Sequence, residues 1–322
     1  MRTFLGILLV LLLLAGGGAL YTYLQYNQPG PLQEAHRAMV PRGGLGEVAS
    51  ALAHDGVIRS SLAFQAAALA TNGDGAIHAG ELEFPAGASL HDVLHILRNA
   101  KPIQHLVTIP EGLTAKQVSA LLDRTPLLDG GPVLPPEGGL LPETYAYDRG
   151  SSRSAVMDRA VRAMSRALER AWAARSPTLP LDRPEDALIL ASIVERETGK
   201  PEERPRIAAV FLNRLRQGMK LQSDATVVYG ASGGLGTLDH GLTRAELDRD
   251  DPYNTYRIPG LPPGPIAMPG AAALRAATQP AQTDELFFVA DGTGGHVFAR
   301  TAEEHLRNVA RWREVERTRR PP

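Results

Sequence analysis

The sequence predicts an α+β protein that consists of a single N-terminal transmembrane helix, a small α+β domain and a larger α+β domain. Three observations lead to this class. A run of 21 residues near the N-terminus carries no charge. After it, apolar residues at helical spacing alternate with short strand-like segments. Segments rich in proline and glycine separate these stretches and predict turns and loops.

The composition excludes several function classes. The formal net charge of −1 argues against a nucleic-acid binder that depends on overall charge. Cysteine is absent, which excludes disulfides and thiolate catalysis. Hydrophobic residues make up 43% of the chain, which is enough for a core. We find no internal repeat.

Residues 1–26 are predicted to be a transmembrane anchor. The uncharged run 4–24 would span about 31 Å as a helix, the thickness of a bilayer core. Tyr21, Tyr23 and Tyr26 follow where interfacial aromatic residues are expected. A cleaved signal peptide is the alternative, with Gly17 and Ala19 as the small residues of a cleavage site. The run is longer than the usual apolar core of a signal peptide, and Arg2 is the only charge before it, so we favour the anchor. Either way, the bulk of the chain is predicted to be exported.

Residues 27–41 are polar and contain prolines, which predicts a linker, and 42–102 form the predicted small domain. A helical pattern begins at Leu45. Ser60 or Ser61 is placed to cap the next helix, residues 62–69, and residues 77–84 alternate as a short strand. Ser89 is placed to cap a last helix with a clear apolar stripe.

The larger domain is predicted to cover residues 103–322. Thr114 is placed to cap a helix, and 125–143 is irregular because of its prolines and glycines. Helices are expected at 155–175, from Pro184 and from about Pro205. Residues 221–229 are predicted to be extended, and 251–270 to be a loop. Two short strands at 286–290 and 296–298 flank a glycine-rich turn and predict a hairpin, which a basic helix follows.

The helix that opens at Pro184 is the most informative element for function. It is almost entirely apolar, which predicts burial, and it runs into Glu195 and Glu197. Gly199 is placed to end it in the left-handed conformation. Burial and the negative end of the helix dipole both raise the pKa of a carboxyl there. A carboxylic acid that stays protonated near neutral pH is suited to general-acid chemistry.

Geometry separates the two acids without choosing between them. Residues two apart on a helix point about 200° from each other, so they serve different faces. Glu197 lies on the stripe of Leu190 and Ile193, whereas Glu195 follows another stripe. The alternative interpretation is a frayed helix end with both glutamates in solvent.

No metal site is predicted. Residues 72–81 fall in the frame of a calcium-binding loop, but its first ligand position is Ala70, which has no side-chain oxygen. His91 and His95 have the spacing of a zinc helix, but the required glutamate and a third ligand are missing.

The C-terminal two-fifths of the chain resembles the endolytic murein transglycosylase family (MltG/YceG-like). The matching segments are Ala191-Ser-Ile-Val-Glu-Arg-Glu-Thr198, Glu203-Arg-Pro205, Val210-Phe-Leu-Asn-Arg-Leu-Arg216, Gly218-Met-Lys-Leu-Gln-Ser-Asp-Ala-Thr226, Tyr253-Asn-Thr-Tyr256, Gly260-Leu-Pro-Pro-Gly-Pro-Ile266, Pro269-Gly270, Phe288-Val-Ala-Asp-Gly292, Gly295-His-Val-Phe298 and Glu304-His305. The N-terminal half agrees in layout, with an anchor, a small LysM-like unit at 42–102 and then Thr108-Ile-Pro-Glu-Gly112.

The resemblance implies a lytic transglycosylase with an α+β catalytic domain at 103–322 and Glu197 as the catalytic acid. Glu197 would protonate the glycosidic oxygen between N-acetylmuramic acid and N-acetylglucosamine. The 6-hydroxyl of the muramic acid would then attack, which leaves a 1,6-anhydro end and terminates or trims a nascent strand. Substrate-binding candidates are Gln222, Ser223, Asp224, Thr226, Asn254, Tyr256 and His296.

No cofactor is implied. With the anchor, the resemblance implies a single-pass protein of the cytoplasmic (inner) membrane, with the catalytic domain on the periplasmic side. Its partners would be peptidoglycan strands, the membrane and peptidoglycan synthases. Two departures from the family pattern, at Glu81 and at Glu137-Gly-Gly-Leu-Leu-Pro142, remove aromatic residues and put sugar stacking in doubt. The alternatives are a non-catalytic wall-binding scaffold and a hydrolytic muramidase that uses Asp224 with Glu197.

Overall fold

The structure is a computed structural model that describes residues 17, 20 and 23–319. The described chain divides into two compact units. Unit 1 runs to His105 and includes Ala146–Arg149, and unit 2 comprises Leu106–Tyr145 and the chain from Gly150 onward. The domain boundary predicted from the sequence lies at 102/103.

Most of the predicted anchor, residues 1–26, lies outside the described residues. Within the part that is described, no helix is both long enough and apolar enough to cross a bilayer.

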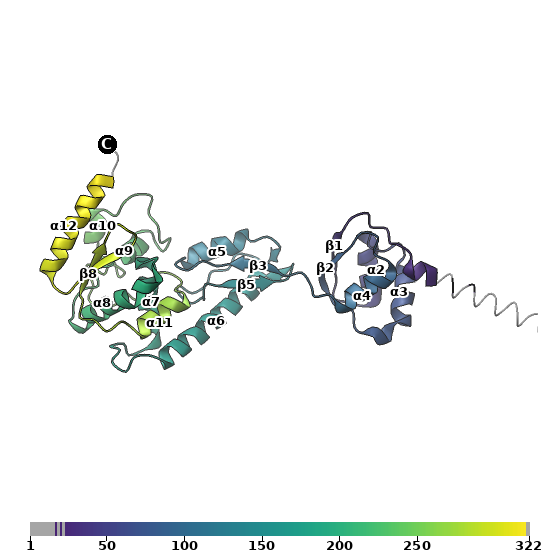
Figure 1. Cartoon of the computed structure of the whole chain (residues 1–322), viewed down its shortest axis with the longest axis horizontal. Helices are drawn as coiled ribbons and strands as arrows, with labels where there is room; N and C mark the ends of the chain where they lie inside the picture. Colours follow the sequence, from purple (N-terminus) through teal and green to yellow (C-terminus); the bar gives the residue numbers. More distant parts are fainter. Residues whose placement is uncertain (1–16, 18–19, 21–22, 320–322) are drawn as a thin grey trace, which may run out of the picture. The chain divides into compact units, whose positions relative to one another are not determined.

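Unit 1 follows the order β-α-α-β-α (Figure 1). Its elements are β1 (His36–Val40), α2 (Leu45–His54), α3 (Ser61–Ala70), β2 (Gly80–Phe84) and α4 (Leu90–Asn99). A short 3-10 turn, Asn72–Asp74, lies between α3 and β2. β1 and β2 pair antiparallel, with His36 opposite Phe84. The helices cover this ribbon and enclose a core that includes Leu52, Phe64 and Leu94.

Side-chain caps start two of these helices where the sequence places them. The Ser60 hydroxyl accepts a hydrogen bond from the backbone of Ala63 at the start of α3. Ser89 and Asp92 form a reciprocal capping box at the start of α4. Each cap satisfies backbone N–H groups that a helix start otherwise leaves without a partner.

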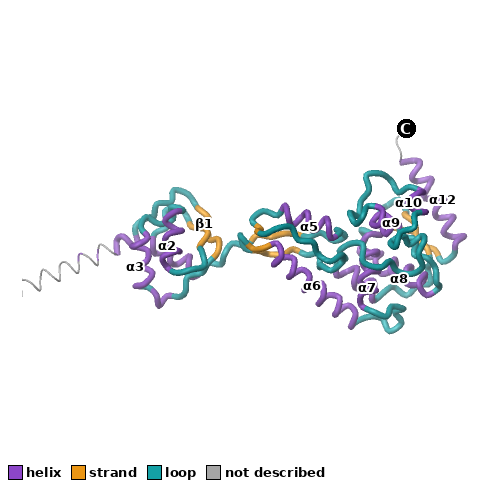
Figure 2. Tube along the Cα trace, turned by 180° about the vertical axis from the view of Figure 1, so that it is seen from behind, coloured by secondary structure: helices purple, strands orange, loops and turns teal. Residues whose placement is uncertain are grey.

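Unit 2 is mainly helical, as the tube view shows (Figure 2). Its helices are α5 (Ala115–Arg124), α6 (Arg153–Ala173), α7 (Pro184–Glu197), α8 (Arg204–Arg216), α9 (Asp224–Ala231), α10 (Arg244–Asp248), α11 (Ala271–Thr278) and α12 (Ala302–Arg319). A 3-10 turn, Pro201–Glu203, joins α7 to α8. α7 lies at the centre, where α6, α8, α9 and α11 pack around it. Leu190 and Ile193 of α7 are fully buried, in agreement with the prediction of a buried helix.

The strands after α4 form small two-stranded ribbons instead of one sheet. β3 (His105–Thr108) pairs with β5 (Thr144–Tyr147), and β4 (Leu128–Asp129) runs parallel to β6 (Ser151–Ser152). β7 (Phe287–Ala290) and β8 (His296–Ala299) form the predicted antiparallel hairpin, and α12 packs against it. This hairpin brings the C-terminal part of the chain next to the end of α7.

Two local predictions are wrong. Residues 221–229 are not extended, because α9 begins at Asp224. The Thr226 hydroxyl donates to the Ser223 carbonyl and supports the first helical turn. Gly199 does not supply a left-handed residue, because α7 ends on Thr198 in extended conformation and Gly199 has no positive φ.

Candidate active site

Glu197 is the last residue of α7, and its carboxylate accepts a hydrogen bond from the Ser223 hydroxyl. Ser223 is the residue before α9, and only 2% of it is exposed. The contact therefore joins the C-terminal end of one helix to the N-terminal end of another. The two residues lie 26 positions apart, and no local pattern in the sequence predicts that they are in contact.

The environment of Glu197 favours its neutral form. Burial raises the pKa of its carboxyl above the ordinary value, and the negative charge of Asp224 acts in the same direction. The hydrogen bond from Ser223 and the positive charges of His296 and Arg196 oppose this shift but do not reverse it. A carboxyl with a raised pKa keeps its proton to a higher pH than an ordinary glutamate does, which suits a proton donor.

The backbone around Ser223 is held by Thr255. The backbone N–H of Ser223 donates to the Thr255 hydroxyl over 2.9 Å, and the Thr226 and Thr255 hydroxyls lie 2.9 Å apart. Thr226 and Thr255 are both fully buried. The residue before Ser223, Gln222, has a φ of 52°, which is uncommon for a side chain other than glycine. This left-handed turn orients Ser223 toward Glu197, and local strain of this kind often accompanies functional sites.

Asp224 and Tyr256 form the exposed edge of the site. The Tyr256 hydroxyl donates to Asp224 Oδ1 over 2.5 Å. Burial raises the pKa of Tyr256, and the hydrogen bond to Asp224 and the charges of Asp224 and Glu197 raise it further. Asp224 is exposed, so a carboxylate faces solvent near the partly buried Glu197.

Arg214 of α8 places a cation near this group. Its Nη1 donates to the Leu221 carbonyl over 2.9 Å and to Gln222 Oε1 over 3.3 Å, and its Nε donates to the Leu286 carbonyl over 2.6 Å. Burial lowers the pKa of Arg214, whereas the charges of Tyr256 and Glu197 raise it. Arg214 thus joins the 220–222 segment to the β7–β8 hairpin and places positive charge near the acid.

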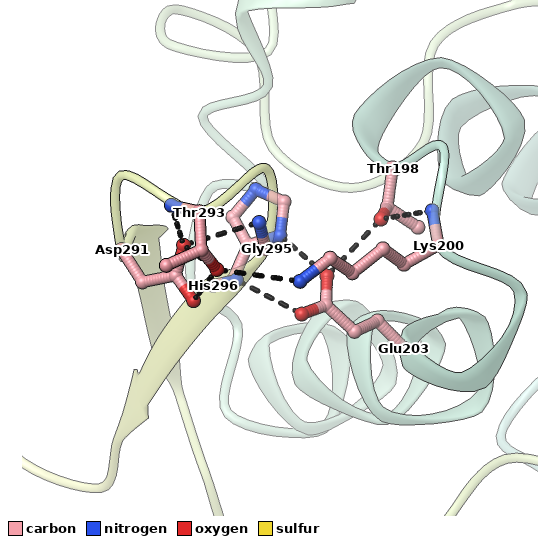
Figure 3. Close-up of polar contacts among 7 residues, drawn as sticks. All are labelled: Thr198, Lys200, Glu203, Asp291, Thr293, Gly295 and His296. Atoms are coloured by element: carbon pink, nitrogen blue, oxygen red, sulfur yellow. Dashed lines mark hydrogen bonds and ion pairs between the residues drawn. The ribbon is translucent and has the colours of Figure 1, made fainter.

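His296, at the start of β8, is held by Glu203 (Figure 3). Its backbone N–H donates to Glu203 Oε1 over 2.9 Å, and its Nδ1 lies 2.7 Å from Glu203 Oε2. The Thr198 hydroxyl donates to the same carboxylate over 3.1 Å. Burial opposes ionisation of Glu203, but these hydrogen bonds and the charge of His296 together hold the pKa of its carboxyl below the ordinary value. Glu203 therefore binds both Thr198, the residue after Glu197, and His296 of the β7–β8 hairpin.

The turn of the hairpin is ordered by Asp291. Its carboxylate accepts from the backbone of Thr293 over 2.6 Å and from that of Gly295 over 3.1 Å (Figure 3). Lys200 reaches across to the Thr293 hydroxyl at 3.4 Å. A Cβ at Gly295 would lie 2.5 Å from Lys200 Nζ and 2.6 Å from Glu203 Oε1, so a glycine allows the turn to approach this closely.

Glu195 has a different role from Glu197. Its side chain is 4% exposed and forms an ion pair with Arg204 over 2.7 Å, and Oε2 accepts from the Gly270 backbone over 2.9 Å. Arg204 also reaches Glu111 over 3.2 Å. Glu195 thus ties α7 to α8 and to the start of α11, which agrees with the prediction that the two glutamates serve different faces.

Asn254 lies at the centre of a loop and uses its side chain to hold that loop. It is 1% exposed, and its amide nitrogen donates to the carbonyls of Leu247 and Arg249 over 3.0 and 2.8 Å. Its oxygen accepts from the Tyr256 backbone over 3.0 Å. These bonds occupy both ends of the amide.

Five of the predicted residues either contact Glu197 or lie close to it. They are Gln222, Ser223, Asp224, Tyr256 and His296. Thr226 and Asn254 do not contact Glu197 and instead hold the backbone of the segments that carry Ser223 and Tyr256. Thr255, Arg214 and Glu203 were not predicted, although each lies within a segment that carried the family resemblance. Within the described residues, no cluster of three or more metal-ligating side chains is present.

The fold and the site define a class: an α+β protein with a partly buried glutamic acid at a helix end, lined by hydroxyl groups and an exposed carboxylate. Comparison with known proteins identifies the family to which the chain belongs. A model of the YceG-like family matches residues 39–311, and the chain belongs to this family.

Named relatives agree with this assignment. The chain is 29% identical to the endolytic murein transglycosylase of Streptococcus pneumoniae serotype 2 (strain D39), over 84% of this chain and 57% of that protein. It is 43% identical to the endolytic murein transglycosylase of Bacillus subtilis (strain 168), over 37% of this chain and 32% of that protein. The chain thus spans little more than half the length of the pneumococcal relative. A crystal structure of a yceG-like protein from Listeria monocytogenes is similar, with a TM-score of 0.52 and 26% identity over 85% of this chain and 99% of that chain.

Proposed function

We propose that this chain is an endolytic murein lytic transglycosylase that cleaves the bond between N-acetylmuramic acid and N-acetylglucosamine in peptidoglycan strands. The observation that carries the proposal is the partly buried Glu197 side chain, with its raised pKa and its hydrogen bond from Ser223. The names of the pneumococcal and Bacillus relatives support the same reaction.

In the first step, Glu197 donates its proton to the glycosidic oxygen as the bond to the anomeric carbon breaks. Burial raises the pKa of this carboxyl, so it still carries the proton at a pH where an exposed glutamate has lost it. Positive charge develops on the sugar ring, and the exposed Asp224 carboxylate lies next to Ser223 to stabilise that charge. N-acetylglucosamine leaves with the proton on its oxygen.

In the second step, the 6-hydroxyl of the muramic acid attacks its own anomeric carbon. Glu197 is now a carboxylate and takes the hydroxyl proton, which restores the acid. The Ser223 hydroxyl donates to the Glu197 carboxylate and stabilises this charged form between the two steps. Atoms balance without water, and the product ends in a 1,6-anhydro ring.

A hydrolytic muramidase is the second candidate, because Asp224 adjoins the site. An ordinary glycoside hydrolase needs a second carboxylate as nucleophile or as the base that activates water. The Asp224 carboxylate accepts the Tyr256 hydroxyl over 2.5 Å. This bond stabilises the carboxylate and favours an electrostatic role over that of a base.

The product decides between the two reactions. Purified sacculi are digested with the full-length chain in heavy-oxygen water, and the fragments are analysed by mass spectrometry. We expect 1,6-anhydro ends, ~18 mass units lighter than the hydrolytic product, since no water enters. Asp224→Asn should slow the reaction and leave the product unchanged. Reducing ends that carry heavy oxygen would contradict the proposal, and an inactive wild-type chain that still binds sacculi would favour the scaffold.

We also propose that residues 1–26 anchor the chain in the cytoplasmic membrane, with unit 2 on the periplasmic side and peptidoglycan synthases as partners. The uncharged run 4–24 and the tyrosines that follow it support this placement.

We also propose that unit 1 is a LysM-like module, which its β-α-α-β start supports.

A further inference from the structure

Helix α3 of unit 1 exposes a face with no charge. Its ten residues, Ser61–Ala70, include no acidic or basic side chain. Phe64 and Ala68 are buried in the core, whereas Leu62 and Leu69 are 80% and 68% exposed. Residues seven apart lie on the same side of a helix, so these two leucines share one outward face. Single exposed leucines are ordinary on a soluble protein, but a grouped set marks a contact surface.

The end of the uncharged run 4–24 also exposes apolar side chains. Leu20, Tyr23 and Leu24 are 59%, 66% and 48% exposed. Tyr23 and Tyr26 line a groove of about 690 Å³ together with small side chains of α3. The side chains of α3 and its two capping residues that line this groove are Ser60, Ala63, Ala66, Ala67, Ala70 and Thr71.

Tyr26 fixes the two parts to each other. Its ring packs edge-on against His91 of α4 at 5.5 Å between centroids, and it contacts the core of unit 1. Because Tyr26 lies two residues after the uncharged run 4–24, the start of unit 1 is held close to the end of that run. We call Leu20, Tyr23, Leu24, Leu62 and Leu69 the α3 surface.

We propose that the α3 surface lies in the headgroup region of the bilayer that the N-terminal run enters. A helix with an uncharged outward face can rest in the interface with its apolar side chains below the headgroups. Tyrosines at the same level are typical of that region. Arg59, exposed just before α3, places a cation where anionic headgroups attract it. Unit 1 would thus contact the membrane through the α3 surface, in addition to its covalent link to the anchor.

This proposal rests on the proposed anchor and is independent of the chemistry at Glu197. A second copy of the chain is the competing occupant of the same face. The absence of cysteine in the sequence permits a direct test, because one introduced cysteine becomes the only labelling site. Leu62→Cys and Leu69→Cys carry a nitroxide spin label on the α3 surface. Leu134→Cys in unit 2, 64% exposed, and Met39→Cys in β1, 36% exposed, are the controls.

The full-length variants are placed in vesicles of phosphatidylcholine and phosphatidylglycerol and washed with carbonate. Power saturation then compares the access of oxygen, which concentrates in lipid, with that of a water-soluble nickel chelate. We expect labels at 62 and 69 to favour oxygen over nickel several-fold more than the labels at 134 and 39 do.

Three outcomes would overturn the proposal. Equal accessibility at all four positions in a chain that resists carbonate would place α3 in water and leave the anchor intact. Strong dipolar coupling between labels at 62 would show that a second copy covers the face. Release by carbonate would remove the anchor and this proposal with it. None of these outcomes bears on the product of the reaction, so the proposed function is tested separately.

Discussion

Neutralising each glutamate at the end of α7 should separate stability from chemistry. Glu195→Gln removes the negative charge that faces Arg204 over 2.7 Å, where the two side chains are 4% and 9% exposed. Breaking a buried ion pair from one side costs about 3–5 kcal/mol, because the remaining charge is left without its partner. Two features place this case near the lower limit. Glu111 still lies 3.2 Å from Arg204, and the new amide oxygen can still accept from Gly270.

The expected loss can be expressed as a melting temperature. For a unit of about 150–250 residues, 1 kcal/mol corresponds to roughly 2–4 °C, so a loss of about 3 kcal/mol lowers the melting temperature by roughly 6–12 °C. The folded fraction of Glu195→Gln at low temperature should keep most of its activity, because its carboxylate does not contact Glu197 or Ser223.

Glu197→Gln should lower the activity and leave the stability unchanged or higher. It keeps the size of the side chain but removes the transferable proton, so turnover should fall by about 10²–10⁴. Its stability should not fall. Because burial raises the pKa of Glu197 in the folded chain, the wild type is stabilised below the ordinary carboxyl pKa and loses that stability as the pH rises through the folded value. The neutral variant should therefore melt at the same temperature as the wild type or higher, with the largest gain at alkaline pH.

Thermal melts at pH 5, 7 and 9 and initial rates of anhydro-end formation from sacculi measure both effects. The wild type and Glu195→Asp, which keeps the charge, are the controls. Equal loss of turnover in both glutamine variants with unchanged melts would refute the assignment of roles. So would a Glu195→Gln variant that melts with the wild type.

Two further predictions concern the alkaline limb of the pH–rate profile, which reports the pKa of the proton donor. Ser223→Ala removes a hydrogen bond that lowers the pKa of Glu197, so the limb should move to higher pH. Asp224→Asn removes a negative charge that raises the same pKa, so the limb should move to lower pH. Profiles of kcat/KM between pH 5 and 9 measure both shifts, with Thr226→Ser as a control that keeps the hydroxyl. Shifts of the same sign, or none in either variant, would contradict Glu197 as the group that titrates.

Local signals in the sequence predicted most of the elements. The hairpin at 287–299 follows from alternating residues around Asp291-Gly-Thr-Gly-Gly295, and the same aspartate holds the turn by bonds within five residues. Ser60, one of the two predicted candidates, and Ser89 cap their helices. Such features are predictable because the interacting groups are neighbours in the chain.

Local signals failed where distant contacts decide the conformation. The segment at 221–229 looked extended, but its start is bonded to Thr255, and Arg214 holds the preceding turn. Gly199 was predicted to end α7 in left-handed conformation, but the Thr198 hydroxyl bonds to Glu203 and the chain leaves the helix extended. Thr255 and Arg214 are distant from the first segment, and Glu203 in the second is itself bonded to His296 of the β7–β8 hairpin, so a local pattern does not contain the deciding partners.

The sequence by itself determined that α7 is buried and that it ends in two acids on opposite faces, because helical spacing and apolar composition are local properties of those residues. Only the tertiary structure decided what each acid does. It brought Arg204 and Gly270 to Glu195 and Ser223 to Glu197. Glu195 forms an ion pair with Arg204, whereas burial and the charge of Asp224 raise the pKa of Glu197 against the effect of its hydrogen bond from Ser223, and that difference depends on which residues pack around each acid.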